Sequence, residues 1–570
     1  SRVDNPLVYS LSLAVYCSAW TYYGSVGMAA TSGLLFLPIY LGPTVFIVLW
    51  WTVLRKLVRL KNLHHITSIA DFISARYNKS QPLAVLATLF AIVGIVPYIA
   101  LQLKALISTF VLITGASPQA AQQGASMSSW IGAHVGPVVT VVMILFTIIL
   151  GVRRLDPTER HEGMIMAVAV ECLVKLLAFL IAGFYVTYVM FDGFQDIFHQ
   201  VTETPYRMMV SFWGKEDLYY TRWASFFILS MSAILFLPRQ FHVAVVENGD
   251  ERHIRTAMWL FPLYMLLINI FVVPIALGGL LKGYPVTQAD NFVLLLPLNH
   301  GEPWVSLLVF IGGFSAAVGM IMISSVTMAT MMTNHLLLPL VGWVPFLGSL
   351  KRHLLKCRWA AVAFYMLLCY WFEDRVGESY MLVNIGLISF AAMLQFAPPI
   401  LGGLFWRRAN KTGALLGMGA GFLVWIYTLL FPSFVKSGWV AQRLLDEGPW
   451  GIAFLNPEHL FGLTALDPLS HTVFWSVLFN VGCYVVGSLF ADSTEEELSL
   501  AEEFVTVLAP GSLLYRPRGR EAYIDLSQKV GDIRTILGQY FSQQDAEAIL
   551  DKCMKEACID EHQKVSIVQL

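Results

Sequence analysis

The chain has 570 residues, of which 57% are hydrophobic and only 13% are charged. Soluble proteins average about 25% charged residues, so this composition excludes a string of water-soluble domains and indicates a polytopic membrane protein. The 37 Lys and Arg residues and the 38 Asp and Glu residues give a net charge of −1, and no basic stripe carries aromatics, which argues against nucleic-acid binding. The seven cysteines include no CxxC pair, so no disulfide framework or zinc ribbon is indicated.

Apolar pieces that are long enough to cross a bilayer occur twelve times along the chain. A helix needs about 20 apolar residues to cross a hydrocarbon core of roughly 30 Å. The pieces run approximately over 7–30, 34–54, 82–113, 136–151, 163–191, 224–246, 256–282, 303–338, 358–373, 379–406, 412–433 and 468–491. We therefore expect a membrane domain over 1–491.

Lys and Arg alternate between the loops in a regular way, and this predicts the orientation. They gather in the loops 55–79, 153–160, 252–255, 351–358 and 407–411, whereas the intervening loops carry few. Positive residues near helix ends stay in the cytoplasm. Because the alternation holds across all twelve spans, both ends of the chain are predicted to be cytoplasmic.

After Ala491 the composition changes to that of a soluble tail, 492–570, which we expect to form a small helical bundle. Ser493 and Glu496 are spaced as a capping box, and a second helical stretch is predicted over 523–557. The tail has 15 Asp and Glu against 8 Lys and Arg, so it is expected to dock on protein and not on an anionic membrane surface. Three potential zinc ligands, Cys553, Cys558 and His562, lack a fourth, so no metal site is predicted there.

Two spans carry signs of an internal break. The first contains small residues and paired glycines beside Trp20, Tyr22 and Tyr23, and the sixth contains Pro238 followed by Arg239. These spans open successive groups of five, and matching interruptions in two halves point to a transporter site built on inverted repeats. The alternative for Pro238 is a kink without function.

Charged residues inside the spans supply the candidate chemistry. Arg239 either turns inward to bind a carboxylate or lies near the interface and extends to water. Glu171 and Lys175 are spaced as a helical ion pair, which we favour as structural; the functional alternative has Glu171 take and release a proton. Lys104, near Gln102, has no partner in its own helix and is a second candidate cation.

At these residues the chain resembles the sodium/solute symporter family, which has the LeuT-like fold. The resemblance covers roughly 5–490 and is carried by SLSLAVYCSAWTYYGSVG from Ser10, VPYIALQLKA from Val96 and LFLPRQFHVAVVEN from Leu235. The last stretch, GMIMAVAVECLVKLLAF from Gly163 and the tail most resemble the transporter-like input region of CbrA-type sensor histidine kinases, in which the tail would be a STAC domain. The resemblance implies an all-α, 5+5 inverted-repeat membrane protein. It also implies thirteen spans, one of them before Ser1.

The resemblance also implies where a sodium ion would bind, and here the chain departs from the family. The backbone carbonyls would be those of Ala14 and Cys17, and the two hydroxyl residues of the eighth span align with Val318 and Gly319, which have no side-chain oxygen. Ser324 and Ser325 come six residues later, about 9 Å along the helix. Sodium coupling is therefore in doubt. Ser315 remains a single candidate ligand, and protons through Glu171 are the substitute.

These features predict a transporter-like module of a bacterial inner membrane that binds a small carboxylate-bearing nutrient, such as histidine or acetate, by alternating access. The candidate substrate-binding residues are Trp20, Tyr22, Tyr23, Gln102, Lys104, Arg239, Gln240 and His242. The candidate ion-coupling residues are Ala14, Cys17, Ser315 and Glu171. The tail would pass the signal to a histidine kinase and response regulator beyond this chain, because no kinase motif or other catalytic site occurs before Leu570. The rival is an ordinary sodium- or proton-coupled symporter with no signalling role; a homo-oligomer is left open.

Overall fold

The computed structural model describes residues 5–115, 134–153, 161–211, 217–376, 382–509, 523–556 and 564–566. Within these ranges the chain is helical apart from two short antiparallel strands, β1 (Tyr523–Asp525) and β2 (Lys564–Ser566). Each of the twelve predicted apolar pieces carries helix. Eight helices are long and apolar enough to cross a membrane, two further helix pairs are bent by 61° and 48° at short breaks, and Pro6–Tyr16 and Val135–Gly151 are shorter apolar helices.

The first group of five spans has these elements: α1 (Pro6–Leu13), η1 (Ala14–Tyr16), η2 (Trp20–Gly24), α2 (Ser25–Ser32), η3 (Gly33–Phe36), α3 (Pro38–Phe46), η4 (Ile47–Leu49), α4 (Val53–His64), α5 (Ile69–Arg76), α6 (Gln81–Thr114), α8 (Val135–Gly151), α9 (Glu162–Tyr185) and η6 (Val186–Met190). The connection to the second group holds α10 (Phe194–Thr202) and η7 (Pro205–Val210).

The second group has α11 (Asp217–Phe236), α12 (Pro238–Phe241), η8 (His242–Val246), α13 (His253–Asn269), α14 (Val272–Leu281), η9 (Val286–Asn291), α15 (Phe292–Asn299), α16 (Pro303–Met332), η10 (Thr333–Leu337), α17 (Leu338–Trp343), η11 (Pro345–His353), α18 (Leu354–Val376), α19 (Leu382–Met393), η13 (Leu394–Phe396) and α20 (Ala397–Phe405). The remainder has α21 (Lys411–Trp425), η14 (Ile426–Leu430), α22 (Phe431–Lys436), α23 (Arg443–Asp446), η15 (Pro449–Gly451), η16 (Ala453–Leu455), η17 (Leu460–Gly462), α24 (Pro468–Phe490), α25 (Glu495–Thr506), α26 (Leu526–Tyr540) and α27 (Gln543–Glu556).

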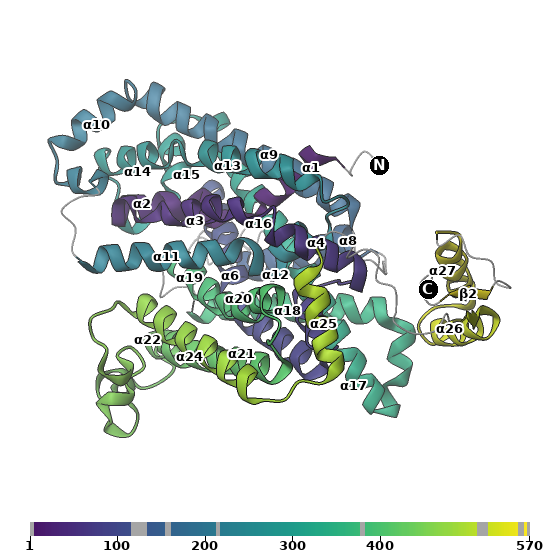
Figure 1. The fold of residues 1–570 in the computed structure, drawn as a ribbon. Coiled ribbons are helices and arrows are strands. Elements are labelled where there is room, and N and C mark those ends of the chain that lie inside the picture. The colour runs from purple at the N-terminus through teal and green to yellow at the C-terminus, as the bar shows by residue number, and fades with distance from the viewer. Residues whose placement is uncertain are drawn as a thin grey trace.

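The two groups of five pack on one another in a reciprocal way. The first half of span one, α1, packs on α13 of the second group, and the first half of span six, α11, packs on α3 of the first group. The second halves repeat this exchange, since α2 packs on α14 and η8 on α4. Such an exchange is expected of two repeats related by a pseudo-twofold axis. The two broken spans therefore lie at the centre of the helical body (Figure 1).

The predicted basic loops come together at one end of the molecule. Arg55 and Arg59 of α4 bind Glu251 in the turn after span six, and Arg76 of α5 donates from Nε to the carbonyl oxygen of Gly403, 2.8 Å away. We call this the basic end; it is formed by α4, α5, the 247–252 turn and the 405–411 loop. Figure 1 shows α4 and α25 on this side and α10 and α22 on the other. The loop 154–160 lies outside the described residues.

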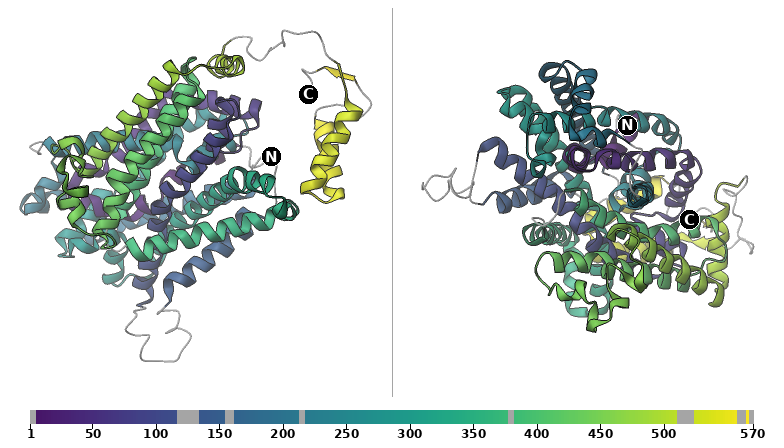
Figure 2. Two further views of the ribbon diagram at one scale, coloured as in Figure 1. Left: turned by 90° about the horizontal axis from the view of Figure 1, so that it is seen from below. Right: turned by 90° about the vertical axis from the view of Figure 1, so that its left-hand side faces the viewer.

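The tail divides into two parts that the sequence did not separate. Helix α25 packs against α20 and α5, so by its contacts it belongs to the membrane body. Its capping box is formed by Thr494 and Glu497, one residue later than predicted, because the chain leaves α24 in an extended conformation that brings Thr494 to the N-cap. The second predicted helical stretch holds two helices, α26 and α27, separated near Phe541, which pack on each other through Val530 and Leu550. Figure 2 shows this pair, in yellow, outside the packed helices. Cys558 and His562 lie outside the described residues.

Candidate functional site

The first span is broken at Cys17 and Ser18, as predicted. Cys17 has an extended backbone (φ −78°, ψ 97°), and the helix resumes in η2. Gln102 of α6 forms hydrogen bonds at the break through both sides of its amide. Its Oε1 accepts from the backbone N–H of Ala19 at 3.0 Å, and its Nε2 donates to Ser18 Oγ at 3.3 Å. Ser18 Oγ also bonds Tyr98 Oη at 2.8 Å. Helix α6 thus satisfies the Ala19 N–H and the Ser18 hydroxyl at the break, as buried polar groups require.

The sixth span is broken at Leu237, also as predicted. Leu237 is extended (φ −64°, ψ 129°), Pro238 opens the second half, and the two halves meet at 48°. Proline suits this place because its fixed φ fits the first turn of a helix and its missing N–H would have no partner there. Gln240 donates from Nε2 to the Leu13 carbonyl at 3.4 Å, which ties this half to the first broken span.

Arg239 is the most unusual buried charge in the site. Its side chain is 1% exposed, so the interpretation that it extends to water is wrong, because the helix break turns it inward. None of its three guanidinium nitrogens has a hydrogen-bond partner among the described residues. Its guanidinium carbon lies 4.4 Å from the centre of the Tyr98 ring, and it lines a narrow crevice with Ile95, Ser324 and Met328. A cation–π contact offsets only part of the desolvation of a buried guanidinium.

Lys175 binds the two backbone carbonyls that the resemblance implied as sodium ligands. Its ammonium donates to the carbonyl of Ala14 at 3.0 Å and to that of Cys17, the two acceptors that the resemblance implied for a sodium ion. No ion pair joins Lys175 to Glu171 in the described part of the chain, so the predicted helical pair is wrong. The reason is that the break of span one exposes two backbone acceptors within reach of Lys175, and a buried ammonium needs several acceptors.

The remaining half of the implied sodium site is filled as well. A side chain at Gly319 would begin 1.9 Å from Glu171 Oε2, so the carboxylate stands where a hydroxyl ligand would be. Glu171 Oε2 is buried without a hydrogen-bond partner among the described residues. Ser315 is half-buried about one turn earlier on α16. A sodium ion does not fit this arrangement, because both carbonyls already accept from an ammonium and the aligned residues Val318 and Gly319 offer no hydroxyl.

The other candidate residues have varied surroundings. Trp20 packs on Gly386 of α19, where an added methyl would come within 3.0 Å of its ring. Tyr22 donates to the Val309 carbonyl at 3.0 Å, and Tyr23 abuts Gly313, so both rings pack against α16. Lys104 is half-buried and is not without a partner. His242 contacts Glu247.

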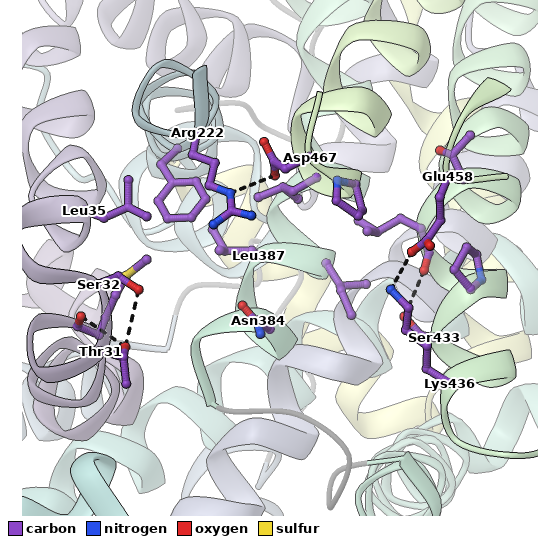
Figure 3. A pocket seen from close by; sticks show the side chains of 18 residues that line it. Thr31, Ser32, Leu35, Arg222, Asn384, Leu387, Ser433, Lys436, Glu458 and Asp467 are labelled. Atoms are coloured by element: carbon purple, nitrogen blue, oxygen red, sulfur yellow. Dashed lines mark hydrogen bonds and ion pairs between the residues drawn. The ribbon is translucent and has the colours of Figure 1, made fainter. Parts of the chain in front are cut away.

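A cavity of about 370 Å³ opens on the side of the breaks away from the basic end. It is lined from α2, α11, α19 and α22, and Figure 3 shows charged pairs along its wall. Arg222 and Asp467 are 3.6 Å apart, and Lys436 pairs with Glu458. Leu387 lines the cavity, and the preceding residue, Gly386, packs against Trp20 of the first broken span.

The basic end, by contrast, is closed by ion pairs. Glu251 Oε2 lies 2.7 Å from Arg59 Nε, and Glu251 Oε1 lies 3.2 Å from Arg55 Nη2. The hydrogen bond from Arg59, with a smaller contribution from Arg55, lowers the pKa of Glu251 to about 2. Tyr9 of α1 donates to the Ala244 carbonyl at 2.7 Å, which joins the two broken spans at this end.

Sequence reasoning missed Tyr98, Ser18, the Arg222–Asp467 pair and the role of Lys175. Tyr98 lay inside the VPYIALQLKA stretch, and Lys175 was noticed only for its spacing to Glu171. Because these contacts join residues far apart in the chain, no local pattern could have assigned them.

Comparison with known proteins agrees with the geometry. No family model matches the chain. It is 23% identical over 422 residues to the uncharacterized symporter YhjB of Bacillus subtilis (strain 168), covering 73% of this chain and 78% of that protein. It is 23% identical over 484 residues to the uncharacterized symporter YodF of the same strain, covering 82% and 86%. A solved Na⁺-coupled sialic acid symporter, in a substrate-bound outward-open state, superposes with a TM-score of 0.56 at 12% identity over 86% of this chain and 91% of that one. The chain has the LeuT-like transporter fold.

Proposed function

We propose that this protein is a symporter-like membrane transporter module that binds a small carboxylate-bearing nutrient between its two broken spans. The observation that carries the proposal is Arg239: a fully buried guanidinium, at the start of a half-helix, with no hydrogen-bond partner among the described residues. The N-terminal end of a half-helix adds a favourable potential for an anion. A carboxylate would supply the two coplanar acceptors that a guanidinium binds best.

The route to this site runs through the cavity on the side away from the basic end. That cavity is lined by polar groups such as Thr31, Ser32 and Asn384. A small amino acid such as histidine, or a short organic acid such as acetate, would pass from this cavity toward Arg239 by a movement of Trp20, which packs on Gly386 next to the lining residue Leu387. This gives Trp20 the role of a gate, and alternating access would follow from rocking the two repeats about the site.

The coupling ion in this proposal is a proton and not sodium. The Lys175 ammonium supplies, from the protein itself, the positive charge that sodium supplies in the family, at the carbonyls of Ala14 and Cys17. Glu171 lies one turn away on the same helix, half-buried, with Oε2 against Gly319. Loss of a proton from Glu171 would leave a carboxylate that competes with the carbonyls of Ala14 and Cys17 for the Lys175 ammonium, which links protonation to the shape of the site.

Uptake into liposomes tests the proposal. Purified protein would be reconstituted and supplied with radiolabelled histidine or acetate under an imposed proton gradient or an imposed sodium gradient. We expect accumulation with the proton gradient and none with the sodium gradient alone. Accumulation driven by sodium would contradict the coupling, and failure of a panel of carboxylates to bind would contradict the site. Binding without uptake would identify a receptor that does not transport.

A relay to a downstream histidine kinase and its response regulator is the second part of the proposal, and a line of aromatic rings supports it. Phe241, two residues after Arg239, packs edge-on against Phe72 of α5 at 5.9 Å between ring centres. Phe72 packs against Phe504 of α25 at 5.7 Å, and Phe504 is fully buried. A ligand that shifts α12 would therefore act on α25. It can do so only to the extent that it binds one arrangement more tightly than the other.

Shortening Phe504 to alanine should release α25 while leaving solute binding within about threefold. Removing a buried phenylalanine costs about 3–5 kcal/mol, which would fall mainly on the local docking of α25. Polar contacts also hold α25, among them Lys56 with the carbonyl of Val505 at 2.7 Å and Arg407 with Glu502 at 2.9 Å, but they do not replace the buried ring contacts. Hydrogen exchange of the α25 backbone would rise in the variant.

Leu498→Ala, on the same helix at a side chain that is 50% exposed, is the matched control and should leave exchange unchanged. In the wild-type protein, added solute should alter exchange in α25, and Phe504→Ala should abolish that response. If solute binds without any effect on α25 in the wild type, the relay is contradicted and the ordinary symporter remains.

A further inference from the structure

Three potential metal ligands converge at the basic end, at the cytoplasm-predicted end of the half-helix that carries Arg239. His161 immediately precedes α9, His242 begins η8, and Glu247 directly follows η8. They come from chain segments about 80 residues apart and each directs one donor atom inward. These three donor atoms all lie within 4.8 Å of one another.

The spacing of the donors is that of ligands around one ion. His242 Nε2 lies 3.1 Å from Glu247 Oε1, and His161 Nδ1 lies 3.5 Å from the same oxygen. Two ligands that each bind a tetrahedral zinc ion at about 2.0–2.2 Å are separated by about 3.4 Å. The two measured distances lie on either side of this value, and the longer one is too long for a strong hydrogen bond.

Burial and charge also favour a cation here. The side chains of His242, Glu247 and His161 are 1%, 3% and 12% exposed. The Glu247 carboxylate places a negatively charged ligand beside the two imidazole rings. The backbone N–H of His161 donates to Glu247 Oε1 at 2.8 Å, which fixes the carboxylate toward the imidazoles.

We infer that His161, His242 and Glu247 form a binding site for a divalent transition-metal ion of the zinc type. Two imidazoles and one carboxylate suit such an ion, whereas calcium and magnesium prefer oxygen ligands alone. The site joins the start of α9 to the end of the broken sixth span. A bound ion would therefore hold the basic end closed, and its loss would loosen that end.

Zinc binding by the purified protein tests the inference. After chelator treatment and dialysis against micromolar Zn²⁺, the wild type should hold one more zinc per chain than Glu247→Gln or His242→Gln. Both substitutions keep a polar side chain of similar size, so the fold is retained while a ligand is lost. X-ray absorption of the bound zinc should show imidazole in its coordination shell.

His353→Ala, which removes an exposed histidine from the loop between spans eight and nine, is the matched control and should retain the extra zinc. Zinc bound by the tail cysteines would be common to all four proteins and would cancel in the comparison. Zn²⁺ should also raise the melting temperature of the wild type and of His353→Ala, but not that of the two ligand variants. Equal zinc content in the wild type and both ligand variants would overturn the site and leave a carboxylate held by hydrogen bonds alone.

Discussion

Replacing Arg239 with methionine should weaken binding of the carboxylate solute by about 100-fold and should, in the same variant, raise the free energy of unfolding by about 1–3 kcal/mol. A hydrogen bond to a charged group contributes about 1.5–3 kcal/mol, and the upper part of that range corresponds to about 100-fold in affinity. The gain in stability arises because the empty site buries a guanidinium without hydrogen-bond partners, while methionine has similar length and no charge.

Because solute binding should weaken while the free energy of unfolding rises, this variant distinguishes a binding role of Arg239 from a structural one. An arginine that held the fold together would lose stability on replacement, and its effect on binding would follow from unfolding. Calorimetric titration with the solute and with its neutral amide gives the binding half, and the variant should bind the amide as the wild type does. Arg252→Met, at an 83% exposed side chain, is the control and should change neither quantity. Undiminished carboxylate binding by Arg239→Met would remove the basis of the proposed function.

Replacing Lys175 with methionine should abolish coupled uptake and lower the free energy of unfolding by about 2–4 kcal/mol. The ammonium is the donor to two buried carbonyls, of Ala14 and Cys17, and each buried acceptor left without a donor costs about 1–3 kcal/mol. The break of span one would then lack the cation that satisfies it. Urea unfolding and uptake in liposomes measure the two effects.

The same uptake and unfolding measurements distinguish the Lys175 ammonium from a bound sodium ion as the cation at these carbonyls. Wild-type uptake and stability should be unchanged when sodium is replaced by potassium, because the carbonyls already have a donor. Lys282→Met, at an exposed residue that ends α14, should behave as the wild type does. A sodium-dependent rise in wild-type stability would show that a sodium site exists that the geometry around Lys175 does not provide.

The sequence alone determined the class of the protein and the outline of its membrane domain. Apolar length, loop charge and the two interrupted spans are local signals, because each depends on residues within about 20 positions of one another. They placed helix at each span and predicted the breaks near Cys17 and before Arg239, where the structure has them. The sequence also identified Ala14, Cys17 and the poor fit of Val318 and Gly319 to a sodium site, through resemblance to a family.

Only the tertiary structure showed that Lys175 binds the two carbonyls of the implied sodium site and that Arg239 is buried without a hydrogen-bond partner among the described residues. Lys175 could be paired from sequence only with a neighbour on its own helix, whereas its acceptors lie about 160 residues earlier in the chain. Arg239 could be interpreted as buried or as reaching water until the surrounding helices showed it 1% exposed. The physical reason is the same in both cases: the energy of a buried charge depends on which polar groups from other helices surround it, and helix packing sets those distances, which the local sequence does not encode.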